Sequence, residues 1–289
     1  MTLRTHLLGA LCGALCSLFF VAGCGSPVQL SVSNYQSDAT FAVNSYLISG
    51  ENDAILVDGQ FTRGDAEKVV TMINASGKTL RSIFLTHAHP DHYLGLDVIA
   101  AAFPGVPIVA TAEVVAEFKA KGPDALASAK TNFGAANIAD KLATVTVLSD
   151  DKLILEGEEL QVVKLSDGES PSAAALYGSR QKLLISGDLL YHRAYLWLAE
   201  CKSDAWVSNL RSLSRLGPIE QVYPGHGAAP ATASVIDENI EYLGTVVPIL
   251  QSANSVSDAI AKVKQRYNYT GGGLLDYSTQ IYFSACKKP

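Results

Sequence analysis

Four potential metal ligands lie within six positions of the stretch at residues 83–92, which reads I-F-L-T-H-A-H-P-D-H. The apolar and β-branched residues at its start are typical of the end of a buried strand. Side chains alternate along an extended segment, so His87, His89 and Asp91 should project from one side, and His92 follows where the chain turns into a helix. Imidazole suits zinc and iron, and a carboxylate adds a charged oxygen ligand. The stretch therefore predicts a metal site and could supply two adjacent ions.

The spacing H-x-H-x-D-H after a hydrophobic strand resembles the metallo-β-lactamase superfamily, whose members are mostly dinuclear metal hydrolases. The resemblance covers about residues 40–267 and implies an α/β fold, a four-layer αββα sandwich. The segment after residue 23 has five histidines, of which His192 alone falls outside the expected ligand positions. The other four are His87, His89, His92 and His226.

Two short motifs extend the resemblance towards the C-terminus. The residues S-G-D, ending at Asp188, follow an expected strand at 182–185 and resemble the aspartate that bridges two metals in this family. The residues P-G-H-G around His226 follow an expected strand at 221–223 and match the last ligand motif. Zinc β-lactamases usually place cysteine or serine where Asp188 stands. The aspartate therefore points to the thioesterase, lactonase and related hydrolase branches.

The motif expected to complete the first metal site departs from the family pattern. The superfamily usually has Gly-His-Thr-x-Gly there, whereas this chain reads S-D-G-E-S-P-S at residues 166–172, with Glu169 in the histidine position. A carboxylate adds a negative charge and favours harder metals such as iron or manganese. A minority branch, including a di-iron oxygenase of nonribosomal peptide synthesis, is similar in using glutamate here. The alternative is that Glu169 is not a ligand and that the first site is weakened or empty.

The resemblance implies a complete dinuclear site. One metal would be held by His87, His89, Glu169 and Asp188, and the other by Asp91, His92, Asp188 and His226, with Asp91 and Asp188 as catalytic residues. Zinc is the expected metal, and iron or manganese is the alternative because of Glu169. A shared water would be acidified and would attack a carbonyl group.

Three further residues are candidates for supporting roles. Asp58 resembles the family's carboxylate that supports a metal-bound histidine, although a turn-forming Asp-Gly is an equal alternative on sequence. Tyr191 and His192 lie just after Asp188, where similar enzymes have a loop over the metals, and are candidate substrate-binding residues. Burial for packing is the competing interpretation for each of them.

Composition restricts the function. The formal net charge is −6 and no cluster of lysine or arginine occurs, which argues against nucleic acid and for a small-molecule substrate. The favoured hypothesis is hydrolysis of an ester, lactone, thioester or amide. A di-iron oxygenase and a non-catalytic metal- or ligand-binding lipoprotein are the alternatives. Export argues against the oxygenase, because the electrons it needs are scarce outside the cytoplasm, and the near-complete ligand set disfavours a non-catalytic role. The oligomeric state stays open.

The N-terminus predicts export. Arg4 and a largely apolar run at 7–21 precede V-A-G-C, which resembles a bacterial lipobox with Cys24 as the lipidated residue. We interpret residues 1–23 as a lipoprotein signal peptide, 24–38 as the lipidated N-terminus and tether, and 39–289 as one domain. A plain secretory signal is the alternative. The expected product is an exported, membrane-anchored bacterial lipoprotein on the periplasmic or extracellular face, which meets the membrane only through its lipid.

The two cysteines that remain after processing and lipidation are Cys201 and Cys286. In an oxidising compartment a lone pair of cysteines in an exported domain is often a disulfide that pins a terminal segment. We therefore predict a bond between them.

Periodicity places these motifs on alternating strands and helices. A strand, helix, strand order around the metal stretch predicts a partly parallel sheet, and residues 113–139 look weakly helical, as a lid or insertion. The expected strands are 41–50, 54–59, 82–85 and 107–110, with 143–148, 152–155 and 160–165 in a second sheet. The expected helices are 66–73, 94–103, about 206–213, 235–250 and 256–267.

Overall fold

The computed structural model describes residues 28–38 and 40–287. The predicted signal peptide and the predicted lipidation of Cys24 lie outside these residues. Within the described part of the chain, no helix is both long enough and apolar enough to cross a membrane.

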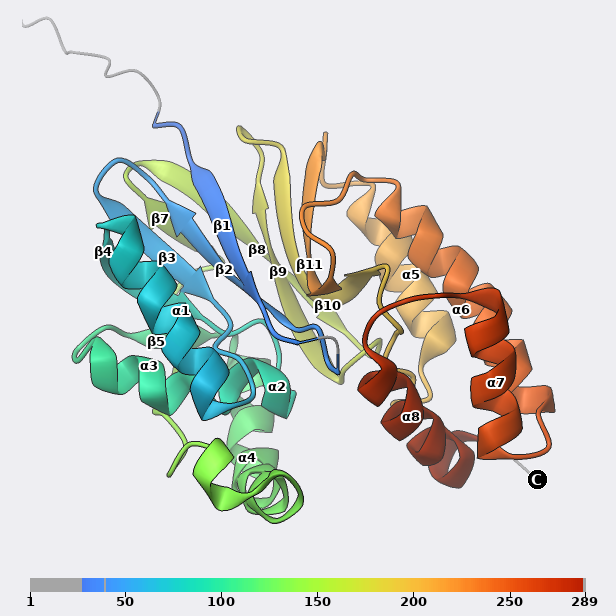
Figure 1. Ribbon diagram of the computed structural model, residues 1–289. Coiled ribbons are helices and arrows are strands. Elements are labelled where there is room, and N and C mark those ends of the chain that lie inside the picture. Colours follow the sequence, from blue (N-terminus) through green and yellow to red (C-terminus); the bar gives the residue numbers. More distant parts are fainter. Residues whose placement is uncertain (1–27, 39, 288–289) are drawn as a thin grey trace, which may run out of the picture.

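Two β-sheets pack face to face at the centre of the molecule (Figure 1). The first has the order β1 (Ser31–Gln36), β2 (Asn44–Ser49), β3 (Asp53–Val57), β4 (Thr79–Phe84), β5 (Ile108–Ala110) and β6 (Thr146–Val147). The second has the order β11 (Gln221–Gly227), β10 (Leu183–His192), β9 (Ser172–Gly178), β8 (Glu158–Ser166) and β7 (Lys152–Leu155). Buried apolar residues of both sheets, such as Ile55, Phe84 and Leu176, fill the space between them.

Helices cover the outer face of each sheet through a separate apolar cluster. On the first sheet lie α1 (Arg63–Ser76), α2 (Pro90–Tyr93), α3 (Leu96–Ala102), α4 (Ala112–Phe133) and the 3-10 turn η1 (Ala135–Asn137). On the second lie α5 (Ser203–Leu213), α6 (Val235–Ser252), α7 (Val256–Arg266), α8 (Gly272–Ile281) and the π-helical turn η2 (Tyr282–Cys286). The predicted four-layer αββα sandwich is confirmed.

Local sequence explains the βαβ unit that carries the metal stretch. Helix α1 begins at Thr62, whose side chain accepts a hydrogen bond from the backbone of Asp65, and it ends at Gly77 in the left-handed conformation. Strands β4 and β5 are parallel, as predicted, and β3 is also parallel to β4, so the carboxyl ends of these strands meet at one edge of the sheet. The potential ligands follow directly from that edge.

Two assignments from the sequence do not hold. Residues 24–38 are not a tether throughout, because Ser31–Gln36 forms the edge strand β1, paired antiparallel with β2, and Leu30 is buried between the sheets. The strand expected at 143–148 shrinks to β6 and joins the first sheet beside β5 rather than the second. A short strand looks the same in either sheet, since its alternation does not say which neighbour it pairs with.

Two elements were not expected from the sequence. Strand β9 is alanine-rich and buried along nearly its whole length, so it shows neither strong strand propensity nor alternation. Helix α8 begins within a run of glycines at residues 271–273, which is typical of a loop. Both elements border the site described below.

The structure joins Cys201 to Cys286, the predicted pair, in a disulfide across a sequence separation of 85 residues. Replacing both cysteines by serine should lower the free energy of unfolding by about 2–4 kcal/mol, because the unfolded chain loses a long cross-linked loop. Urea denaturation of the oxidised protein and the double variant measures the difference. Reductant should bring the wild-type protein to the variant's midpoint and leave the variant unchanged. Equal midpoints for the oxidised protein and the variant would contradict this expectation.

Candidate metal centre

The seven predicted ligands come together at one end of the two sheets. Two of them lie between β4 and the short helix α2, two lie in α2 itself, and the rest come from the second sheet and its loops. They form two neighbouring groups, in each of which one ligand atom per residue lies within 4.8 Å of the others. The first group is His87, His89, Glu169 and Asp188, and the second is Asp91, His92 and His226.

Asp188 lies between the two groups. Its Oδ1 is 3.1 Å from His92 Nε2, and its Oδ2 is 3.0 Å from His226 Nε2 and 3.7 Å from His87 Nε2. The side chain is 3% exposed. One carboxylate therefore reaches imidazoles of both groups, as a residue shared by two ions must.

A bulge in β10 makes room for Asp188. Gly187 is paired with Pro224 and Tyr191 with His226, so three residues of β10 lie opposite Gly225 alone. A Cβ atom at Gly225 would stand 1.9 Å from Asp188 Oδ1. The glycine before His226 is therefore required by the close approach of this carboxylate.

Hydrogen bonds donated by Nδ1 fix the orientation of three imidazoles. His226 Nδ1 donates to the carbonyl oxygen of Phe41 at 2.7 Å, and His92 Nδ1 donates to Asp58 Oδ2 at 2.9 Å. Thr86 Oγ1 donates to Asp58 Oδ2 at 2.8 Å and so accepts from His87 Nδ1 at 3.0 Å. With the proton on Nδ1, each ring turns the lone pair of Nε2 into the cluster, which is the form that binds metal.

In this cluster the lone pairs of neighbouring imidazole nitrogens and carboxylate oxygens face one another. His92 Nε2 lies 3.4 Å from His226 Nε2, and His89 Nδ1 lies 2.9 Å from Glu169 Oε1, so each contact needs a proton or a cation. Three buried atoms in the described residues of the cluster lack a hydrogen-bond partner: His87 Nε2, Glu169 Oε2 and Asp188 Oδ1. Buried polar atoms without partners are rare and costly. Nitrogen and carboxylate donors at these positions fit divalent transition metals.

Burial and charge shift the pKa values of these groups in opposite directions. Burial, with the charge of His92, lowers the pKa of His87 well below its usual value. At Asp188 burial is outweighed by His226 and His92, which hold the pKa of the carboxyl well below its usual range. Burial raises the pKa of Glu169 to about 7. A neutral His87 and an ionised Asp188 are ready to bind a cation, whereas Glu169 holds a proton below neutral pH.

Metal affinity should fall with decreasing pH, because the pKa of His226 is also raised, to about 10, where burial is outweighed by the charge of Asp188, and it should fall more steeply below about 7. Glu169 is protonated there, and an ion must displace that proton, which weakens binding about tenfold per pH unit for each proton released. Competition with a chelator of known affinity at pH 8, 7 and 6 measures the slope. The variant Glu169→Gln should release one proton fewer. Equal affinities at pH 6 and pH 8 would count against the assignment.

Tyr191 links the two carboxylates of the first group. Its hydroxyl donates to Asp188 Oδ2 at 2.6 Å and lies 3.3 Å from Glu169 Oε1, and its ring stacks on His226 at 4.8 Å between centroids. The amide of Asn239, on α6, holds the Tyr191 backbone by accepting from its N–H and donating to its carbonyl. The tyrosine is thus fixed within the cluster.

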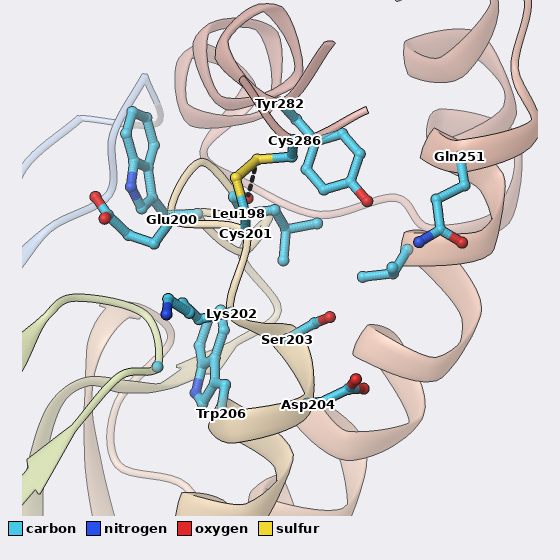
Figure 2. Close-up of a pocket in the computed structure, with 13 residues that line it drawn as sticks. Leu198, Glu200, Cys201, Lys202, Ser203, Asp204, Trp206, Gln251, Tyr282 and Cys286 are labelled. Carbon is cyan, nitrogen blue, oxygen red and sulfur yellow. Dashed lines mark hydrogen bonds between the residues drawn. A yellow bond between two sulfur atoms is a disulfide. The ribbon is translucent and has the colours of Figure 1, made fainter. Parts of the chain in front are cut away.

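Glu200 contacts the centre without belonging to any sequence motif. Its Oε1 lies 3.7 Å from His89 Nε2, while Nδ1 of the same ring faces Glu169. Figure 2 shows Glu200 beside Cys201, whose disulfide ties this loop to the C-terminal segment. A proton on Nε2, facing Glu200, leaves Nδ1 as the atom that could bind a metal.

A cavity of about 700 Å³ opens over the centre. Asp91, Glu169, Asp188 and Tyr191 lie on its wall, and apolar residues of α4 and α8 line it together with the aromatic rings of Phe41, Phe61 and Trp197. The predicted pocket residue His192 does not line it, and its Nδ1 donates to the carbonyl oxygen of Ala228 at 2.9 Å. His192 therefore binds to the backbone and not to the cavity, although it lies only four residues after Asp188 in the sequence.

Several groups that support the centre were not predicted from the sequence. Thr86, Glu200, Asn239 and the carbonyl of Phe41 each hold a predicted ligand or Tyr191 in place. The role of Thr86 could have been predicted, since it immediately precedes His87 in the sequence. Asn239 lies on a helix, and a lone buried amide there gives no signal until the fold brings it against β10.

Comparisons with known proteins agree with this geometry. Residues 39–226 match the family model described as "Metallo-beta-lactamase superfamily". The chain is 25% identical over 199 residues to the probable metallo-hydrolase M6_Spy0554 of Streptococcus pyogenes, covering 68% of this chain and 83% of that protein. It is 27% identical over 182 residues to a hydroxyacylglutathione hydrolase of Methylobacillus flagellatus, covering 63% and 60%.

Other matches are shorter or structural. A stretch of 71 residues is 39% identical to the uncharacterized protein YobT of Bacillus subtilis, but it spans only 30% of that protein and 25% of this chain. Among solved structures, a metallo-beta-lactamase family protein of Thermus thermophilus, TTHA1429, superposes with a TM-score of 0.61 at 19% identity, over 89% of this chain and 93% of that one. At this identity the likeness concerns the fold.

Proposed function

Because the chain belongs to the metallo-β-lactamase superfamily, we propose that this metallo-hydrolase uses two divalent ions to cleave an ester, lactone, thioester or amide bond of a small molecule. One observation carries the proposal: three unpartnered buried atoms, His87 Nε2, Glu169 Oε2 and Asp188 Oδ1, converge beside a cavity. Such atoms need a cation, and the cavity offers room for a substrate next to it.

The proposed ligands follow the two groups. His87, His89, Glu169 and Asp188 would hold one ion, and Asp91, His92, Asp188 and His226 the other. Zinc is the metal we propose, and the additional carboxylate of Glu169 makes iron or manganese the alternative. Ions bound there would acidify water and polarise a carbonyl group.

The chain's own residues would position the reactants. Asp91 lies on the cavity wall with its Oδ2 3.3 Å from His226 Nε2, so it can hold the attacking water and take its proton. Tyr191 donates a hydrogen bond to Asp188 Oδ2 and lies on the wall of the cavity. Water adds to the acyl carbon, the bond to the leaving oxygen, sulfur or nitrogen breaks, and the proton passes to the leaving group.

Metal analysis and a substrate panel test the proposal together. Protein purified without added metal should carry two ions per chain, lose hydrolysis on chelation and regain it when metal is restored. The panel contains neutral esters, lactones, thioesters and amides. Protein with two ions that cleaves none of them but consumes dioxygen with a reductant would be an oxygenase, the alternative raised by Glu169. Protein that binds metal and does neither would be a binding lipoprotein.

We also propose that the protein is an exported lipoprotein anchored at Cys24, on the strength of the V-A-G-C motif. Mass spectrometry of the mature N-terminus should find diacylated or triacylated Cys24. An unmodified N-terminus at any other residue would refute the proposal. Replacing Cys24 by serine should leave the protein unlipidated and release it from the membrane fraction.

A further inference from the structure

The cavity over the metal centre has two apolar walls, each supplied by a helix. Helix α4 contributes Ala125, Ala129 and Phe133, and α8 contributes Leu274 and Tyr277. In Figure 1 the two helices lie at the same end of the molecule, on either side of the loops that carry the ligands. Helix α8 lies after residue 226, beyond the part of the chain that the family model matches.

Two large apolar side chains stand exposed at this cavity. Phe133 is 44% exposed and Tyr277 is 55% exposed, although residues of this kind are usually buried. Neighbours hold both in place: Phe133 packs against Phe61 with ring centroids 4.8 Å apart, and Tyr277 against Trp197 at 5.7 Å. The walls are thus aromatic surfaces already in position to take an apolar group.

Positive charge is missing from the same walls. Among the described residues that line the cavity, none is a lysine or an arginine. The charged groups are three carboxylates, Asp91, Glu169 and Asp188, together with His89. A substrate with its own carboxylate, such as a glutathione conjugate, is normally held by an arginine or a lysine. Here it would lose its hydration and gain no such partner.

We propose that the substrate is uncharged and that its acyl portion, an apolar chain or ring, lies between α4 and α8. The inference rests on the proposed function and adds the class of substrate. Hydrolysis would place the acyl carbonyl at the metal centre and the hydrocarbon against Phe133 and Tyr277. Water adds, the acyl bond to oxygen or sulfur breaks, and the products are a carboxylic acid and an alcohol or thiol.

Binding can be tested without turnover. N-phenyl-1-naphthylamine, an uncharged dye that brightens in apolar surroundings, should bind to metal-free protein in the cavity. A long-chain methyl ketone should displace it, and the same ketone with a terminal carboxylate should compete at least about tenfold less well, since a buried charge would lack a partner. Equal competition by the two ketones would overturn the proposal, whether or not the protein hydrolyses anything.

Kinetics give a second measure on the metal-loaded protein. Across a series of neutral acyl esters with one common leaving group, kcat/KM should rise about threefold per added methylene until the cavity is filled. Esters with a carboxylate at the end of the acyl chain should lose this gain. A flat series, or a preference for the carboxylated esters, would exclude the apolar acyl site while leaving hydrolysis itself established.

Variants separate the walls from the metal centre. Phe133→Ala and Tyr277→Ala should each lower kcat/KM for the longest ester about tenfold and change the acetyl ester less than about twofold. Ile154→Ala is the matched control, because Ile154 is 53% exposed on β7 and does not line the cavity. Equal losses for the short and long esters would show that the two aromatic residues support the fold and do not select the acyl chain.

Discussion

Replacing Asp188 by asparagine should reduce the bound metal to fewer than two ions per chain and lower kcat/KM by about 10²–10⁴. The carboxylate lies within 3.1 Å of the Nε2 atoms of both His92 and His226, and it is 3% exposed. Asparagine has nearly the same shape but no charge, so the fold should survive while two divalent ions lose their shared counter-charge.

Metal content by mass spectrometry and kcat/KM on the best panel substrate give the two readouts. Asp150→Asn, an exposed aspartate on a surface turn, is the control and should match the wild-type protein in both. A variant at Asp188 that kept two ions and activity within tenfold of the wild type would show that this residue does not join the sites.

Substitutions at Glu169 should affect one ion and spare the other. Its Oε1 is 2.9 Å from His89 Nδ1, and its Oε2 is 3.7 Å from His87 Nε2 without a hydrogen-bond partner. Glu169→Ala should lower the affinity for one of the two ions by at least about 100-fold. Even residues that only hydrogen-bond to a ligand can contribute that much to metal affinity. Because Glu169 belongs to the first group alone, the second ion should stay bound.

Glu169→His should keep both ions and shift the preference towards zinc, because imidazole replaces a hard oxygen ligand. Removing one negative charge should also make bound water more acidic and move the activity optimum to lower pH. Titration of metal-free protein with zinc, iron(II) and manganese(II) measures the preference. Asp167→Asn, two residues away and exposed, is the control in the same loop. Unchanged affinity for both ions in Glu169→Ala would remove Glu169 from the ligand set.

The sequence predicted which side chains lie together at the centre, because most of them belong to compact motifs. His87, His89, Asp91 and His92 follow one strand, so the strand's direction places them all. The supporting contacts could not be predicted, because they depend on how distant segments meet. Glu200 reaches His89 from a loop more than a hundred residues further along the chain, and no spacing rule connects the two.

The fold was predictable where periodicity and pairing agree. The β3, α1, β4 unit has both, and its strands lie close to the expected residues. Strand β6 was assigned to the wrong sheet because its two exposed residues carry no information about their partner. Helix α8 was not predicted, because its first residues are glycines, although it forms one wall of the cavity. The residues that select a substrate were therefore harder to find than those that would hold the metals.

The edge strand β1 runs from one end of the first sheet towards the end that carries the potential ligands. Ser31 lies opposite Ser49 at one end of the sheet, and Gln36 lies opposite Asn44 at the other, where its side chain donates to the carbonyl of Gly227 next to His226. The chain thus enters the sheet at the end remote from the ligands and runs towards them (Figure 1). For a protein held at Cys24, the mouth of the cavity would face outward from the bilayer surface. Its substrates would then arrive from the surrounding medium, and its products would return there.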